Sequence, residues 1–140
     1  MNVVDTSVTK IKEQFPDVYG IWLFGSSASQ TTTAESDVDL GVLLPQRADS
    51  IKLWQCAQSI AAAVNKEIDL VDLLEASTVM RAQIMREGKR VFCADKFKSE
   101  MFETEALTDY LRFNEERKEV LGSIKYRGKV LGNNGRRTGK

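Results

Sequence analysis

The sequence predicts an α/β (α+β) fold in which a mixed central sheet of about four strands is covered by helices. Short runs rich in β-branched and aromatic residues alternate along the chain with longer segments whose apolar residues recur at helical spacing. The resulting order is α-β-β-α-β-α-β-α, and such a mixture requires helices to cover the faces of one sheet. The last element is the longest, so a long C-terminal helix is also expected.

Breaker residues delimit the first four elements. Pro16 ends the first helix and Pro45 ends the second strand. Asp5 or Thr6 can cap the first helix, and Ser50 can cap the second. In chain order, we expect a helix over 6–15, a strand over 18–24, a strand over 37–44 and a helix over 50–64. The apolar stripe of the second helix is Ile51, Trp54, Ala57, Ile60, Ala61 and Val64.

The second half continues the alternation. Ser77 is expected to cap the third helix and Gly88 to end it. In chain order, we expect a strand over 67–74, a helix over 78–87, a short strand over 89–94 and a long amphipathic helix over 98–126. Near one side of the long helix lie Met101, Ala106, Tyr110, Phe113, Arg117, Val120 and Leu121.

Composition indicates a single globular domain. The 140 residues are 42% hydrophobic and 29% charged, and no run of about 18 apolar residues could span a membrane. Residues 1–126 are expected to form one domain, followed by a basic, disordered tail over 127–140. The N-terminus lacks the regions of a signal peptide, which favours a cytoplasmic location. Cys56 and Cys93, both in apolar segments, are expected to be buried free thiols.

Charge and residue usage exclude several kinds of chemistry. Residues 1–126 carry 15 basic and 20 acidic residues, a net charge of −5, which makes a poor surface for a nucleic-acid backbone. No direct nucleic-acid partner is therefore expected. The chain has no histidine, which excludes Ser-His-Asp and Cys-His nucleophile systems and histidine-based zinc sites. Carboxylates, hydroxyls and metals must perform any catalysis.

The most informative motif is Gly25-Ser26, then ten residues, then Asp37-Val38-Asp39. A Gly-Ser turn after a strand can offer backbone N–H groups and a hydroxyl to a phosphate. Two aspartates separated by one residue of an extended segment point to the same face. Convergent carboxylates of this kind bind hard divalent cations such as Mg²⁺.

A third carboxylate extends the site. Asp69 lies between apolar residues in the middle of the third predicted strand. If that strand neighbours the second, Asp69 joins the Asp37 and Asp39 face, and three carboxylates can hold two Mg²⁺ ions about 3.5–4 Å apart. Asp72 is the competitor, but it has the opposite phase to Asp69 and cannot serve the same face. A purely structural alternative pairs Asp69 with a surface lysine.

These residues resemble the DNA polymerase beta-like nucleotidyltransferase superfamily. The Gly-Ser, ten-residue spacer and Asp-x-Asp pattern is specific for that superfamily, and a later hydrophobic-Asp-hydrophobic strand accompanies it. The tight spacing and short chain are most similar to its minimal nucleotidyltransferase (MNT) branch. The long helix is similar to that of MNT antitoxins paired with HEPN ribonuclease toxins. The resemblance covers residues 10–126 and implies a nucleotidyltransferase fold.

The resemblance also implies roles for the motif residues. Asp37 and Asp39 would hold two Mg²⁺ ions, and Asp69 would hold the catalytic ion and help to deprotonate the attacking hydroxyl. The nucleotide triphosphate of ATP would bind at the Gly-Ser turn, through Gly25, Ser26 and Ser27.

The Gly-Ser turn departs from the family pattern in one respect. Many relatives have a basic residue soon after the Gly-Ser, but this turn reads Gly-Ser-Ser-Ala-Ser-Gln over 25–30. Arg47, Lys52 or a residue of a partner could replace the missing arginine.

The function implied is that of an antitoxin that transfers AMP from ATP to a tyrosine of its HEPN toxin, within a hetero-oligomer. Two alternatives remain open from the residues. The protein could neutralise the toxin by direct binding without catalysis, with Trp54, Tyr110 and Phe113 as interface anchors, although aromatic residues more often pack in a core. It could also be a nucleotidyltransferase acting on a small molecule.

Overall fold

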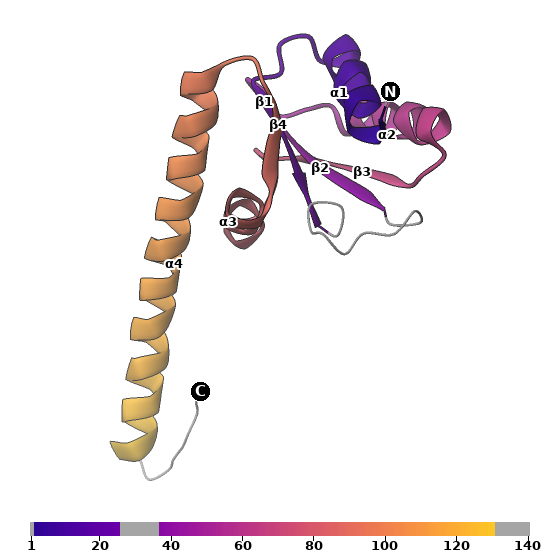
Figure 1. Cartoon of the computed structure of the whole chain (residues 1–140). Coiled ribbons are helices and arrows are strands. Elements are labelled where there is room, and N and C mark those ends of the chain that lie inside the picture. The colour runs from indigo at the N-terminus through magenta and orange to yellow at the C-terminus, as the bar shows by residue number, and fades with distance from the viewer. Residues whose placement is uncertain (1, 26–36, 131–140) are drawn as a thin grey trace. The chain divides into compact units, whose positions relative to one another are not determined.

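A computed structural model describes residues 2–25 and 37–130, with side chains through residue 117. The predicted order of helices and strands is confirmed (Figure 1). The elements are α1 (Val3–Gln14), β1 (Gly20–Phe24), β2 (Val38–Leu43), α2 (Ser50–Val64), β3 (Ile68–Asp72), α3 (Thr78–Glu87), β4 (Lys89–Cys93) and α4 (Lys96–Val130).

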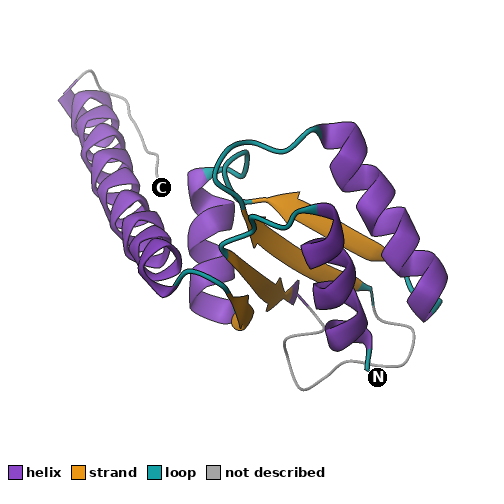
Figure 2. Cartoon of the chain, turned by 90° about the horizontal axis from the view of Figure 1, so that it is seen from above, coloured by secondary structure: helices purple, strands orange, loops and turns teal. Residues whose placement is uncertain are grey.

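The four strands form one mixed sheet in the order β3-β2-β1-β4. β1 is antiparallel to both of its neighbours, whereas β2 and β3 are parallel because α2 crosses over between them. Helices lie on both sides of this sheet (Figure 2). The parallel pairing has a direct consequence for the site, since β2 and β3 begin at the same end of the sheet.

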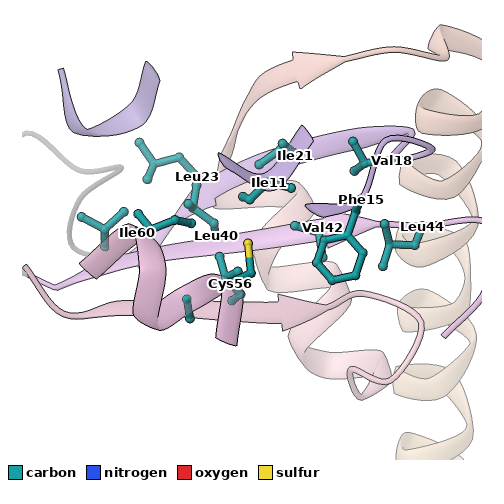
Figure 3. Close-up of a cluster of buried hydrophobic side chains, with 13 residues drawn as sticks. Ile11, Phe15, Val18, Ile21, Leu23, Leu40, Val42, Leu44, Cys56 and Ile60 are labelled. Carbon is teal, nitrogen blue, oxygen red and sulfur yellow. The ribbon is translucent and has the colours of Figure 1, made fainter. Parts of the chain in front are cut away.

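One face of the sheet packs against α1 and α2. Alternate residues of β1, Ile21 and Leu23, point to this face, as period-two alternation requires. Figure 3 shows how these side chains meet those of the two helices. The cluster consists of Ile11, Phe15, Val18, Ile21, Leu23, Val38, Leu40, Val42, Leu44, Cys56, Ala57, Ile60 and Leu70.

The opposite face is covered by α3 and the first turns of α4. Trp22, the residue between Ile21 and Leu23, is fully buried there with Leu43, Leu73 and Ile84. The Trp22 indole N–H donates to the Glu103 carboxylate at 3.2 Å, and Glu103 also forms a 3.2 Å ion pair with Arg90. This bond satisfies a polar group that burial would otherwise leave unpaired.

The predicted caps of α1 and α2 are wrong by a few residues. Asn2 caps α1 by accepting the backbone N–H of Asp5, so neither Asp5 nor Thr6 is the cap. Asp49, rather than Ser50, caps α2, where its carboxylate accepts the N–H groups of the first helical turn. A carboxylate at this position also interacts favourably with the helix dipole.

The ends of α3 agree with the sequence. The Ser77 hydroxyl accepts the N–H of Met80 at 3.1 Å, which confirms the predicted cap. Gly88 ends the helix as expected, in extended rather than left-handed backbone, and its N–H donates to the carbonyl of Ile84 at 2.8 Å. A side chain at Gly88 would collide with that carbonyl and with the carbonyl of Leu23.

Two predictions of burial are wrong. Ile51 and Trp54 are 66% and 63% exposed, because the buried face of α2 is centred on the neighbouring positions Cys56, Ala57 and Ile60. Helical spacing alone did not fix the rotation of the helix against its two packing partners, α1 and the sheet. Cys56 is a buried free thiol as predicted, but Cys93 is exposed because it ends the edge strand β4.

The long helix α4 continues to Val130, four residues beyond the predicted end at 126. α4 contains glycines at 122 and 128, each of which weakens a helix by about 1 kcal/mol without breaking it. The chain separates into two compact units, Met1–Leu107 and Thr108–Lys140. Residues 131–140 of the predicted tail lie outside the described residues. In the part of the chain that is described, no helix is both long enough and apolar enough to cross a membrane.

Candidate nucleotide and metal site

The parallel pairing of β2 and β3 brings the predicted aspartates together. Asp39 lies opposite Asp69 in the register, which confirms that the two strands are neighbours. The N–H of Val38 donates to the carbonyl of Glu67 at 3.0 Å, so the segment containing Asp37 is held beside the start of β3. Residues opposite each other in adjacent strands project to the same face.

The three aspartates line one pocket of about 450 Å³ at this end of the sheet. Asp37 and Asp69 are exposed, while Asp39 is half-buried between β1 and β3. The complete lining is Asp37, Asp39, Gln58, Ala61, Lys66, Glu67, Ile68 and Asp69. The pocket is therefore acidic, open to solvent and formed by β2, β3 and one side of α2.

The neighbouring carboxylates influence the protonation of Asp39. Burial raises the pKa of Asp39 above its ordinary value, and the neighbouring charges of Asp69 and Asp37 raise it further. A raised carboxyl pKa means that the negative charge is disfavoured in this environment. A bound divalent cation would remove that penalty, which is the usual role of convergent carboxylates.

Gly25 is required at its position for two reasons. Its φ is +75°, a conformation that residues with a side chain rarely adopt. A Cβ atom at this position would also overlap a carboxylate oxygen of Asp39. The backbone that ends β1 therefore passes directly against the half-buried aspartate. Ser26 and Ser27, the other predicted residues of this turn, lie outside the described residues.

The donor set fits a hard divalent cation, since carboxylate oxygens are the ligands that Mg²⁺ prefers. Asp37, Asp39 and Asp69 share the pocket, but in the described part of the chain no three Asp, Glu or Cys side chains are arranged closely enough to bind one ion together. The three predicted ligands therefore line the same pocket. The binding of two Mg²⁺ ions there remains a prediction.

Asp72, the competitor of Asp69, has a different environment. Only 6% of its surface is exposed, and its carboxylate accepts the backbone N–H of Ala48 at 2.7 Å and of Leu74 at 3.0 Å. It joins the loop before α2 to the turn after β3. The opposite phase predicted for Asp69 and Asp72 is confirmed, because Asp69 lines the pocket and Asp72 is used structurally.

The basic residues proposed to replace the missing arginine lie elsewhere. Arg47 and Lys52 line a second pocket, which follows the C-terminal end of β2. Arg47 there forms an exposed 3.4 Å ion pair with Glu75. The aspartates lie at the opposite end of this six-residue strand, about 20 Å away. These two side chains are therefore placed away from the acidic pocket.

Three polar or charged pocket residues were not predicted from the sequence, namely Gln58, Lys66 and Glu67. Gln58 reaches the pocket from α2 and Lys66 from the turn before β3. The available signal was the position of Lys66, which is three residues before Asp69 and therefore at the same end of the sheet as the Asp-x-Asp motif. Gln58 carried no signal, because its contribution depends on how α2 is rotated against the sheet.

Comparison with known proteins agrees with this geometry. Residues 6–97 match the family described as polymerase beta, nucleotidyltransferase. A protein of Shewanella oneidensis named protein adenylyltransferase MntA is 32% identical over 114 residues, which cover 81% of each chain.

Two solved structures extend the similarity to three dimensions. One, described as a toxin–antitoxin with AMP-PNP, has a chain with a TM-score of 0.78 and 30% identity, covering 89% of this chain and 98% of that one. Another, described as tri-AMPylated Shewanella oneidensis HEPN toxin in complex with MNT antitoxin, has a TM-score of 0.71 and 27% identity, with 88% and 98% coverage. The Gly-Ser and Asp-x-Asp motif, the mixed sheet that carries it and these matches together show that the chain belongs to the polymerase beta nucleotidyltransferase family.

Proposed function

We propose that this chain is an antitoxin that acts as a magnesium-dependent protein adenylyltransferase in the cytoplasm. It transfers AMP from ATP to a tyrosine of its cognate HEPN ribonuclease toxin, with which it forms a hetero-oligomer, and so silences the toxin. The observation that carries the proposal is the register of Asp39 opposite Asp69 in a pocket that Asp37 also lines. The relative named protein adenylyltransferase and the complex of an AMPylated HEPN toxin support the choice of acceptor.

Each predicted site residue has a role in this proposal. Asp37 and Asp39 would hold both Mg²⁺ ions, and Asp69 would hold the catalytic ion. When bound, Mg²⁺ neutralises the charge that develops on the phosphoryl and leaving oxygens. Gly25 closely approaches Asp39, one of the proposed metal ligands, and we assign triphosphate binding to Gly25, Ser26 and Ser27.

The reaction needs no nucleophile from this chain. The tyrosine oxygen of the acceptor attacks the α-phosphorus of ATP and forms a new P–O bond. The bond from that phosphorus to the bridging oxygen breaks, and pyrophosphate leaves with the electron pair. We assign to the Asp69 carboxylate, which is exposed in the pocket, the role of receiving the proton of the attacking hydroxyl. Positioning and charge neutralisation provide the catalysis, which is consistent with a chain without histidine.

The test mixes the purified chain, Mg²⁺-ATP and the toxin encoded by the adjacent gene, and then measures intact masses. We expect the toxin to gain the mass of one or more AMP groups and to lose its ribonuclease activity. The matched control is Asp39→Asn, which keeps the size of the side chain and removes its charge. Normal modification by Asp39→Asn, or no adduct with the wild-type chain, would overturn the proposal.

A second candidate is neutralisation by direct contact. It is favoured by the large exposed apolar side chains of Ile51 and Trp54, one helical turn apart on α2. A chain carrying both Asp37→Ala and Asp39→Ala distinguishes the two functions. If this variant still suppresses the toxin at equal concentration, binding accounts for the antitoxin effect.

A further inference from the structure

The proposed ATP site receives no cation from the segments that form most of it. No lysine or arginine occurs between Lys12 and Arg47, a stretch of sequence that contains β1, β2 and the residues between them. The pocket is lined instead by three aspartates and one glutamate. A triphosphate is itself a polyanion, so its oxygens would face like charges across the pocket. A basic side chain from another segment would offset part of this repulsion, in addition to any bound Mg²⁺.

Lys66 is the one basic side chain among the described residues that line the acidic pocket. It is half-buried and lies in the turn between α2 and β3. Its ammonium group is a compact charge on a flexible stem, which suits the recognition of phosphate oxygens as a point charge. Lys66 therefore combines the required charge with the required location.

The backbone on both sides of Lys66 is fixed. Asn65 adopts a left-handed conformation with a φ of 56° and donates its N–H to the carbonyl of Ala61 at 2.8 Å, which ends α2. On the other side, the carbonyl of Glu67 accepts the N–H of Val38 at 3.0 Å. Lys66 is thus held between a helix cap and the first bond of the β2–β3 pairing, at the same level of the sheet as the Asp-x-Asp motif.

We propose that Lys66 is the phosphate-binding cation of this site, with its ammonium group contacting the triphosphate oxygens of bound ATP. This inference rests on the proposed function, because it assumes a nucleoside triphosphate in the acidic pocket. The competing explanation is that Lys66 serves the fold alone, by neutralising neighbouring carboxylates.

Other basic residues are placed less favourably. Arg47 and Lys52 lie at the opposite end of β2, around the second pocket. Arg90 is engaged by Glu103 at 3.2 Å and by Glu100 at 3.6 Å on the α4 side of the sheet. Lys52 is an exposed lysine that lines a pocket without the aspartates, so it provides a matched control for the loss of one positive charge.

The test measures binding of ATP and of AMP, each with Mg²⁺, to the full-length chain by titration calorimetry. Lys66→Met should weaken ATP binding by about tenfold or more, the size expected for one charge-assisted contact, and should change AMP binding much less. Lys66→Arg should restore most of the affinity, and Lys52→Met should bind like the wild type. In AMP-transfer assays, Lys66→Met should raise the KM for ATP more than it lowers kcat.

The outcomes separate this inference from the proposed function. If the wild type binds ATP and transfers AMP, and a folded Lys66→Met or Lys66→Gln variant binds ATP equally well, only the role of Lys66 is wrong. Equal losses for ATP and AMP would also overturn it, because they indicate a change in the pocket rather than a contact with the triphosphate. If the wild-type chain binds no ATP, both proposals fail. Thermal unfolding of each variant reports whether it is folded. If Lys66→Met is not folded, Lys66→Gln is used in its place.

Discussion

Asp69 and Asp72 occupy the same short strand, three residues apart, yet their environments are opposite. Asp69 is exposed in the acidic pocket, where its charge raises the pKa of Asp39. Asp72 is buried and accepts two backbone N–H groups, from Ala48 and Leu74. The first carboxylate shares its pocket with three other acidic side chains and one lysine, and the second is satisfied by backbone donors.

This difference separates two uses of a charged residue in an apolar strand. A buried carboxylate is tolerated when hydrogen bonds compensate its lost hydration, and Asp72 meets this condition within the protein. The half-buried Asp39 carboxylate, by contrast, lies near the like charges of Asp69 and Asp37, and a divalent cation bound in this pocket would offset that repulsion. Substitutions at the two places should therefore affect different properties of the molecule.

The largest effect is expected on activity at Asp39. Asp39→Asn should reduce AMP transfer at least about a hundredfold, because it removes a charged metal ligand from the site where charge develops. The free energy of unfolding should hardly change, since the substitution also removes a disfavoured charge. Quantitative mass spectrometry of the toxin and thermal unfolding of the variant measure the two quantities. An active variant would mean that Asp39 is not a ligand.

The converse is expected at Asp72. Asp72→Ala leaves two buried backbone N–H groups without an acceptor and should lower the free energy of unfolding by about 2–4 kcal/mol. Transfer by the remaining folded protein, measured well below the melting temperature, should stay close to that of the wild type. Urea denaturation and the same transfer assay test this. A stable but inactive Asp72→Ala variant would reverse the roles assigned to the two aspartates.

The different roles of Asp69 and Asp72 could largely be predicted from the sequence. Alternation along the third strand correctly separated Asp69 from Asp72, and the order of all eight elements followed from breakers and periodicity. The acidic pocket itself was anticipated through the expected pairing of two strands that both contain an aspartate.

What escaped prediction depends on tertiary placement. Periodicity defines the apolar stripe of a helix only to within about one residue. The actual rotation of α2 against the sheet leaves Ile51 and Trp54 exposed and brings Gln58 to the pocket. Lys66 differs from Gln58 in this respect, because its position three residues before Asp69 already indicated the end of the sheet at which the aspartates lie.

A smaller effect on stability is expected at Gly25, which follows β1 and contacts the site residue Asp39. Gly25→Ala should lower the free energy of unfolding by about 1–3 kcal/mol, because it strains a left-handed backbone and collides with Asp39. In an Asp39→Ala background the collision disappears and only the backbone strain is left. The cost of Gly25→Ala should therefore be lower in that background, and a double-mutant cycle measures the difference. Strictly additive costs would show that Gly25 and Asp39 do not touch.

The smallest effect concerns the two thiols, which repeat the contrast between a buried and an exposed group. Burial raises the pKa of Cys56 to about 11, so at pH 8 almost none of it is thiolate, the form that reacts with iodoacetamide. Cys93 is exposed at the end of β4. Native protein should therefore be alkylated once, at Cys93, and a second time only after unfolding. Peptide mapping identifies the site, and rapid alkylation of Cys56 in the native state would show that the contact between α1 and α2 opens readily.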